Sequence, residues 1–314
     1  MKEQKIAYWL LEGDPAIRYQ VHRDILDTEP KRLELLRDEM IKRGWVKRLF
    51  DEQSDNGIWG GGLYSPKWIS STYTLLLLKR LSIPSDNEQA RRGAYILLDK
   101  GLYKDGGINF SKTIKSSETC ITGMVLSLLS YFNIKDKRVN NLIDYLIDEQ
   151  MVDGGWNCQR DKGAVHSSMH TTINVLEGFL DFKNVSNYRN KEIIEMEKEA
   201  HQFLLQHKLF KSDKTGEVID RQFTYLSFPP RWHYDILRVL EYFYFYGKKY
   251  DDRMEDALQL LLKKKNKNCK WPLQAKYQGK EFFELEGNTK ESKINTLRAI
   301  RVLKYYKKKL EKGV

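Results

Sequence analysis

Cysteine, histidine and glutamate side chains gather at two places in the chain that lie close to one repeat length apart. Glu118 and Cys120 form the first group, and Cys158, His166 and His170 form the second. Zinc accepts thiolate, imidazole and carboxylate ligands, and three protein ligands leave one position open for a substrate. The same residues are consistent with buried polar packing. They are also consistent with a metal-free thiol- or histidine-based site, with Glu118 and His166 as candidate catalytic residues.

A third chemically capable group is the consecutive run Arg231, Trp232, His233, Tyr234 and Asp235, which places a base, an acid and aromatic rings around one helix start. Arg231 is suited to grip a phosphate or carboxylate. An ion pair between Arg231 and Asp235, at positions i and i+4, explains the pattern equally well. Asp235 is therefore either a candidate catalytic residue or the structural partner of Arg231.

These groups must be positioned by a helical repeat of about 50 residues. Three segments, which begin 50 and 48 residues apart, each carry a Gly-containing turn, a polar loop and a Ser/Thr-rich start to an apolar helix. Thr72, Thr122 and Thr172 follow at equal intervals of 50. The later segments FPPRWHYDILRVLEYFYFYG and NTKESKINTLRAIRVLKYY keep the helix but lose the Gly-Gly turn.

More polar amphipathic helices alternate with the repeat helices. We predict them at roughly 31–49, 88–100, 136–150, 191–207 and 251–265. Their charged faces suit an outer ring, and the more apolar repeat helices suit an inner one. DPAIRYQVHRDIL near the start is a candidate sixth, shortened copy. The periodicity leaves open whether the hairpins stack as an open solenoid or a closed ring, and we predict one domain over residues 1–314.

The Gly-containing turns carry a family resemblance. Asp153-Gly154-Gly155-Trp156, preceded by Gln150, resembles the Gln…Gly-x-Trp repeat of squalene–hopene cyclases, as does Gln53…Gly57-Ile58-Trp59. The opening WLLEGDPAIRYQVHRDIL is similar to bacterial prenyltransferase or squalene-cyclase repeat proteins. The resemblance implies an all-α fold, an α/α toroid with about six inner and five to six outer helices around a central cavity. In it, Trp plugs the gap between hairpins and Gln bonds a free helix end.

The same resemblance implies a zinc site. Protein prenyltransferase β-subunits hold zinc with Asp-x-Cys at one inner-helix start and His at a later one. The matching positions here are Glu118, Cys120 and His170, with Cys158 as a further candidate ligand, although Glu replaces Asp. The Asp-x-Asp-Asp motif of class II cyclases is absent, which argues against squalene-type cyclisation.

Aromatic residues at the predicted helix starts complete the expected cavity. The predicted register makes Trp68, Tyr73, Trp232 and Tyr234 an aromatic wall, and His233 and Arg231 join them as candidate ligand-binding residues. Such walls bind isoprenoid chains and stabilise cations. The alternative is that these rings simply fill the centre of the toroid.

The composition bears on where the protein is located and on what it binds. The 314 residues carry a net charge of +11, with three cysteines, no apolar stretch of 18 residues and no signal-peptide pattern at the start. We therefore expect a cytoplasmic protein without a membrane span. The charge is expected to form a solvated surface, and without an aromatic–basic motif we do not expect a nucleic-acid partner. Nothing in the sequence reports a partner subunit.

The resulting expectation is a prenyltransferase-like or terpene-cyclase-like toroid that binds an isoprenoid-like or apolar ligand in its cavity, with a zinc-assisted transferase as the predicted chemistry. A non-catalytic binding or scaffold toroid is the first alternative, favoured if side chains plug the cavity. A carbohydrate-active α/α barrel is the second alternative. It needs paired carboxylates across the cavity, for which Glu118 and Asp235 are the only rim acids we identify.

Overall fold

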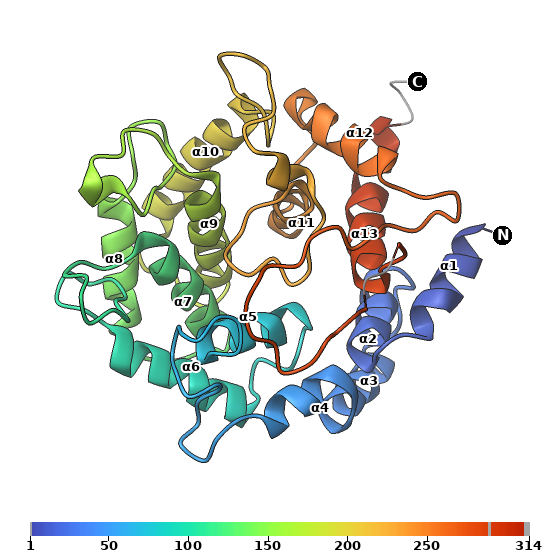
Figure 1. Ribbon diagram of the computed structural model, residues 1–314, viewed down its shortest axis with the longest axis horizontal. Coiled ribbons are helices and arrows are strands. Elements are labelled where there is room, and N and C mark those ends of the chain that lie inside the picture. The colour runs from blue at the N-terminus through green and yellow to red at the C-terminus, as the bar shows by residue number, and fades with distance from the viewer. Residues whose placement is uncertain (1, 288–289, 311–314) are drawn as a thin grey trace.

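The predicted hairpins close into a ring of helices, as Figure 1 shows for the computed structural model, which describes residues 2–287 and 290–310. The inner helices are α2 (Pro15–Asp24), α5 (Ser71–Arg80), α7 (Thr119–Tyr131), α9 (Met169–Lys183), α11 (Ile236–Tyr246) and α13 (Lys293–Leu310). The outer helices are α3 (Pro30–Lys42), α4 (Gly44–Asp51), α6 (Glu88–Gly101), α8 (Val139–Asp148), α10 (Asn190–Gln206) and α12 (Glu255–Lys263), and α1 (Lys2–Leu11) lies beside α2 and α13. The predicted α/α toroid is confirmed.

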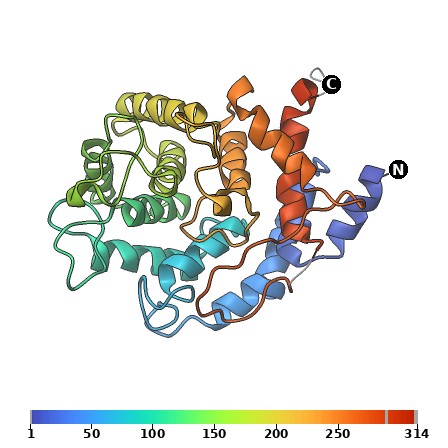
Figure 2. The same ribbon diagram turned by 45° about the horizontal axis from the view of Figure 1, so that its top comes forward.

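Contacts between the two ends of the chain close the ring. Arg301 on α13 donates to the side-chain oxygen of Gln20 on α2 at 2.8 Å, and Gln20 donates to the carbonyl of Arg80 on α5 at 3.1 Å. The segment predicted as a shortened sixth copy therefore is an inner helix. The turned view in Figure 2 likewise places α13 against the N-terminal helices. Within the described residues, no helix is long and apolar enough to cross a bilayer.

A single outer helix predicted at 31–49 is divided into α3 and α4. Gly44 lies at the break with φ +79, and a Cβ there would lie 2.4 Å from the Asp14 carboxylate. Asp14 accepts the backbone N–H of Ala16 at 2.9 Å and that of Trp45 at 2.8 Å. One carboxylate thus caps α2 and also holds the start of α4, where free N–H groups favour a negative charge.

The starts of the inner helices correct the predicted register. The N-cap residues are Ser70, Glu118, Ser168 and Asp235 for α5, α7, α9 and α11. The sequence register placed Trp68 and Trp232 at the first and fourth of these positions, and both lie in the preceding loops instead. The error arose because the loops before α5 and α11 differ in length from those of the other repeats.

The tryptophans of the repeated turns staple neighbouring elements. Each indole N–H donates to the carbonyl ten residues earlier, at the end of an outer helix, at 2.7 Å. These pairs are Trp59 with Leu49, Trp156 with Leu146, and Trp271 with Leu261. Gln53 and Gln150 donate to the carbonyls of Gly57 and Gly154 within the turns and to the carbonyls of Gln89 on α6 and Met196 on α10, rather than to a free helix end as the resemblance implied. The structural role expected for the tryptophan of this motif is confirmed.

A hydroxyl on the following inner helix completes each staple. It accepts the backbone N–H of the plugging residue, the side chain that fills the gap between two hairpins, at 2.9–3.0 Å. The plugging residues are Trp59, Ile108, Trp156 and Trp271. The hydroxyls belong to Ser71, Thr122, Thr172 and Thr296. Ser71 therefore takes the place that the equal spacing had assigned to Thr72.

The turn at Trp271 is a fourth copy that the sequence search missed. Two residues before the plugging residue, the other turns have Gly57, Gly106 and Gly154, with φ near +90. The fourth turn has Cys269 at φ +59 in the same place. A search for glycine fails there, although the backbone keeps the left-handed conformation.

Helices α7 and α9 approach closely because glycines face one another. A Cβ on Gly123 would lie 2.8 Å from backbone atoms of Asn174, and one on Gly178 would lie 2.7 Å from the carbonyl of Gly123. Gly123→Ala is expected to lower the free energy of unfolding by about 1–3 kcal/mol, because the helices must separate. Gly287→Ala, which meets nothing within 4 Å, is the control in chemical denaturation. Equal stabilities for the two variants would contradict this packing argument.

Candidate functional site

The predicted aromatic residues gather at the mouth, the rim formed by the loops that precede the inner helices. His233 is stacked between Trp232, at 3.8 Å between ring centroids, and Tyr277, at 3.6 Å. Trp68 packs edge-on against Tyr73 at 4.7 Å. Burial lowers the pKa of His233 to about 3, helped by the nearby basic groups, so the imidazole is neutral at physiological pH.

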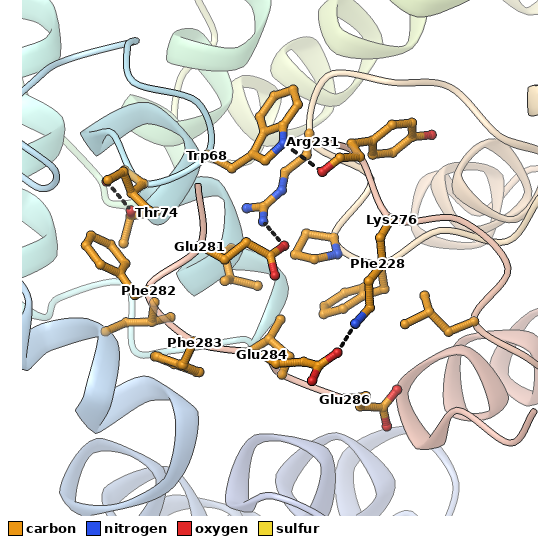
Figure 3. A pocket seen from close by; sticks show the side chains of 17 residues that line it. Trp68, Thr74, Phe228, Arg231, Lys276, Glu281, Phe282, Phe283, Glu284 and Glu286 are labelled. Atoms are coloured by element: carbon orange, nitrogen blue, oxygen red, sulfur yellow. Dashed lines mark hydrogen bonds and ion pairs between the residues drawn. The ribbon is translucent and has the colours of Figure 1, made fainter. Parts of the chain in front are cut away.

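The segment between α12 and α13 covers these rings, and it crosses the ring of helices in Figure 1. The indole N–H of Trp68 lies 3.0 Å from the carbonyls of Tyr277 and Gln278 in this segment. Figure 3 shows Arg231 facing Glu281, with 3.1 Å between the charged atoms. The pocket between them has a volume of about 30 Å³, room for roughly one water. Trp68, Tyr73 and Trp232 of the predicted aromatic wall do lie at the mouth, but Tyr234 does not join them, and side chains fill the space.

Two residues predicted beside the aromatic wall lie in the core. Tyr234 is fully buried, and its hydroxyl donates to the carbonyl of Leu209 at 2.5 Å. Asp235 caps α11 by accepting the N–H of Arg238 at 2.9 Å, and it also accepts the Ser227 hydroxyl at 2.5 Å. Asp235 therefore has a structural role, and the alternative ion pair with Arg231 gives way to the pair with Glu281.

Of the candidate zinc ligands, the structure brings the two cysteines together. The backbone N–H of Cys120 donates to the Cys158 sulfur at 3.1 Å. The His170 Nδ1 atom instead accepts the backbone N–H of Tyr234 at 2.8 Å, and its ring packs on Trp232. Glu118 is half-buried at the start of α7, and burial raises the pKa of its carboxyl.

The candidate ligands do not converge on one point. In residues 2–287 and 290–310, no three His, Cys, Asp or Glu side chains are grouped as a metal site requires. His166 is exposed in the loop before α9. The set as arranged does not fit three-ligand zinc coordination. Zinc stays a prediction, and we derive no chemical step through it.

A larger cavity of about 290 Å³ lies inside the ring, and all six inner helices contribute to its lining. Six basic side chains line it against three carboxylates. These are Arg23, Lys79, Arg80, Arg238, Arg298 and Arg301 against Glu177, Asp181 and Glu241. Phe228 lines both this central cavity and the mouth pocket. Apart from this shared residue, charged side chains line the interior of the toroid, whereas aromatic side chains gather at its mouth.

Glu177 on α9 is the anion of the first ion-pair group in the central cavity. Arg238 on α11 donates to both its carboxylate oxygens at 2.9 and 2.8 Å, and Arg80 on α5 donates at 3.0 and 3.1 Å. Burial by itself raises the pKa of Glu177, but the two guanidinium groups outweigh burial and hold it well below its usual range.

Glu241 on α11 is the anion of the second group. Arg298 donates to one of its oxygens at 2.9 Å, and Arg301 donates to the other. Here too the pKa of the carboxyl is lowered, because the two arginines outweigh desolvation. Asp181 differs, since within residues 2–287 and 290–310 its hydrogen-bond partners are Lys79 and the Ser127 hydroxyl, and burial raises its pKa.

One guanidinium nitrogen of an arginine that lines the central cavity is unsatisfied. Arg298 is 3% exposed, and its Nη1 atom donates to the carbonyl of Ser227 at 2.9 Å. Its Nη2 atom is buried and has no hydrogen-bond partner in the described part of the chain. Buried donors of this kind are rare in folded proteins, so this nitrogen marks a place for an acceptor.

Sequence reasoning predicted a central cavity but missed its charged lining. The available signal was the presence of charged residues on otherwise apolar inner helices, as in Leu78-Lys79-Arg80 and Val239-Leu240-Glu241. Arg238 and Arg298 also belong to this signal, and both face the interior. A charge on the buried side of an inner helix needs a partner from another helix.

No protein-family model and no curated protein sequence matches the chain. Among solved structures, a polysaccharide lyase is 10% identical over 99% of both chains, with a TM-score of 0.52. A protein from Actinoplanes is 13% identical over 93% of this chain and 89% of its own, with a TM-score of 0.50. The type II terpene cyclase MstE from Scytonema is 16% identical over 94% of this chain and 89% of its own, with a TM-score of 0.46. At these identities the likeness is one of fold.

Proposed function

We propose that this protein binds a small anionic molecule in its central cavity. The observation that carries the proposal is the buried, unpaired Nη2 atom of Arg298, which belongs to a residue that lines the cavity. An unmet buried donor costs about 1–3 kcal/mol, and more when the group is charged. A carboxylate or phosphate oxygen would satisfy it with a charge-assisted hydrogen bond.

The charge and size of the cavity support an anion. Six basic side chains line the cavity against three carboxylates, and Asp24, which pairs with Arg23 and Arg301 behind the lining, reduces the formal excess to two positive charges. The volume of about 290 Å³ is at the lower end of small-molecule sites, which span roughly 300–1,000 Å³. Guanidinium groups held by Glu177 and Glu241 are already oriented, which reduces the entropic cost of binding.

Apolar side chains on the same lining favour an anion with a short hydrocarbon portion. Leu76, Leu180, Phe245 and Ile294 lie among the charged residues. A short prenyl diphosphate combines an anionic diphosphate with a short hydrocarbon chain. It is therefore the isoprenoid-like ligand that we propose for this cavity. The fold shared with a polysaccharide lyase makes a sugar the competing ligand, and the basic lining of the cavity favours a sugar that carries a carboxylate. Fold likeness is weak support for either.

A transferase reaction stays a prediction. The residues predicted to perform it, Glu118, Cys120 and His170, are not among those that line the central cavity. Binding without turnover needs only the cavity, and the filled mouth agrees with the alternative of a binding toroid. Binding experiments therefore come before any search for catalysis.

The test is calorimetric titration of the purified protein with dimethylallyl diphosphate, inorganic diphosphate, glucuronate and dimethylallyl alcohol. We expect dimethylallyl diphosphate to bind and the uncharged alcohol not to bind. Arg298→Lys keeps the charge but loses the Nη2 donor, so we expect about 10- to 100-fold weaker binding. Arg231→Lys, which changes a buried arginine at the mouth, is the control and should bind normally.

The outcomes separate the parts of the proposal. Tighter binding of glucuronate than of the prenyl diphosphate would retain the anion site and contradict the hydrocarbon portion. Failure of all three anions, or equal affinity in Arg298→Lys and the native protein, would overturn the anion site itself. The melting temperature of each variant shows whether a loss of binding reflects misfolding.

A further inference from the structure

Two of the three cysteines meet at the mouth although they come from successive repeats. The Cys158 sulfur accepts the backbone N–H of Cys120 at 3.1 Å. The Thr171 hydroxyl lies 3.3 Å from the Cys158 sulfur. Both cysteines are partly exposed. This pair lies outside the central cavity, so its chemistry is independent of anion binding there.

We propose that Cys120 and Cys158 are an oxidative modification site, a dithiol that hydrogen peroxide converts to an intramolecular disulfide. The 3.1 Å contact between the backbone nitrogen of Cys120 and the Cys158 sulfur places that sulfur directly beside Cys120. Cys120 is in the first turn of α7. The two side chains are therefore neighbours in the folded protein, as a disulfide between them requires.

Cys158 is the attacking sulfur. It accepts an N–H from the start of α7, where the helix dipole favours a negative charge, and the Thr171 hydroxyl is placed to donate to it. Its sulfur attacks one peroxide oxygen, the O–O bond breaks, and a sulfenic acid and one water result. The Cys120 sulfur then attacks the Cys158 sulfur, the S–O bond breaks, and the Cys120 proton leaves with the oxygen as a second water.

The disulfide would join the second and third repeats at the mouth. It would close a loop between residues 38 positions apart. Closing a loop of this length restricts the unfolded chain, and we expect a rise in melting temperature of about 5 °C. Tyr64 lies beside both cysteines, so the link would also reduce motion at the edge of the aromatic rings.

The experiment treats the full chain with hydrogen peroxide and counts alkylatable thiols by intact mass. We expect the three free thiols to fall to one, with the remaining thiol on Cys269, and a reductant to restore all three. Peptide mapping should give the Cys120–Cys158 cross-link. Cys269→Ser should still form it, and Cys120→Ser should not. Three alkylatable thiols after treatment, or a disulfide that involves Cys269, would overturn the proposal, and the mass readout holds even for a destabilised variant.

Discussion

Glu177→Gln is expected to lower the free energy of unfolding by about 3–5 kcal/mol. The substitution removes the anion between Arg80 and Arg238 and leaves two buried cations facing each other inside the ring. Arg238 is 1% exposed and cannot turn toward water. Urea denaturation of the variant and the native protein measures the difference.

Glu192→Gln is the matched control for this prediction. Glu192 also forms a two-point ion pair with an arginine, Arg189, at 3.0 and 3.1 Å, but its side chain is 50% exposed. Exposed pairs contribute about 0–1 kcal/mol. Similar losses for both variants would contradict the view that the buried ion pairs hold the inner helices together.

The difference in the free energy of unfolding between the native protein and Glu177→Gln is also expected to depend on pH. The pKa of Glu177 in the folded protein is below its ordinary value of 4.5, because Arg238 and Arg80 outweigh burial. The carboxylate therefore contributes stability above pH 4.5, and that contribution is lost as the pH falls below it. The stability gap between the native protein and Glu177→Gln should narrow in acid, and a gap that widens there would contradict the assignment.

Trp156→Ala is expected to have a comparable effect, about 3–5 kcal/mol. The indole is completely buried, packs edge-on against Phe179 at 5.6 Å, and donates to the carbonyl of Leu146. Its removal leaves a cavity between two hairpins and an unsatisfied carbonyl at the end of α8. Thermal and urea unfolding should show the loss.

Two further variants separate the contributions of the tryptophan. Trp156→Phe keeps most of the packing and loses the hydrogen bond, so we expect an intermediate loss of about 1–3 kcal/mol. Trp9→Ala removes a partly buried indole on α1, outside the staples, and should cost less than Trp156→Ala. Equal losses for Trp9→Ala and Trp156→Ala would contradict the stapling role.

The fold was largely predictable because its signals are local. The spacing of apolar residues located the inner helices, and the Gly-containing turns, two with Trp and one with Ile108, located three of the four copies. The fourth, at Trp271, was missed because Cys269 adopts the positive φ that glycine usually supplies. Register errors at Trp68 and Trp232 came from loops whose length the repeat does not constrain.

The candidate site was predictable only in part. Cys120 and Cys158 do meet, because the first turn of α7 lies beside the loop that precedes α9, although the two residues are not equivalent positions of the repeat. His170 is turned away by a backbone contact with Tyr234, from a loop 64 positions later that no repeat pattern describes. Most of the aromatic wall was located correctly, but the segment that fills and covers it was not anticipated.

Local sequence was enough to specify most of the helical hairpins and three of the four repeated turns, since each depends on residues within one repeat. The contents of the ring depend instead on contacts between distant repeats. Glu177 meets Arg80 and Arg238 from positions 97 and 61 residues away, and Arg301 meets Gln20 from 281 residues away. A buried charge is stable only when such partners surround it. The chemistry of the central cavity is therefore a property of the closed ring and cannot be read from any single repeat.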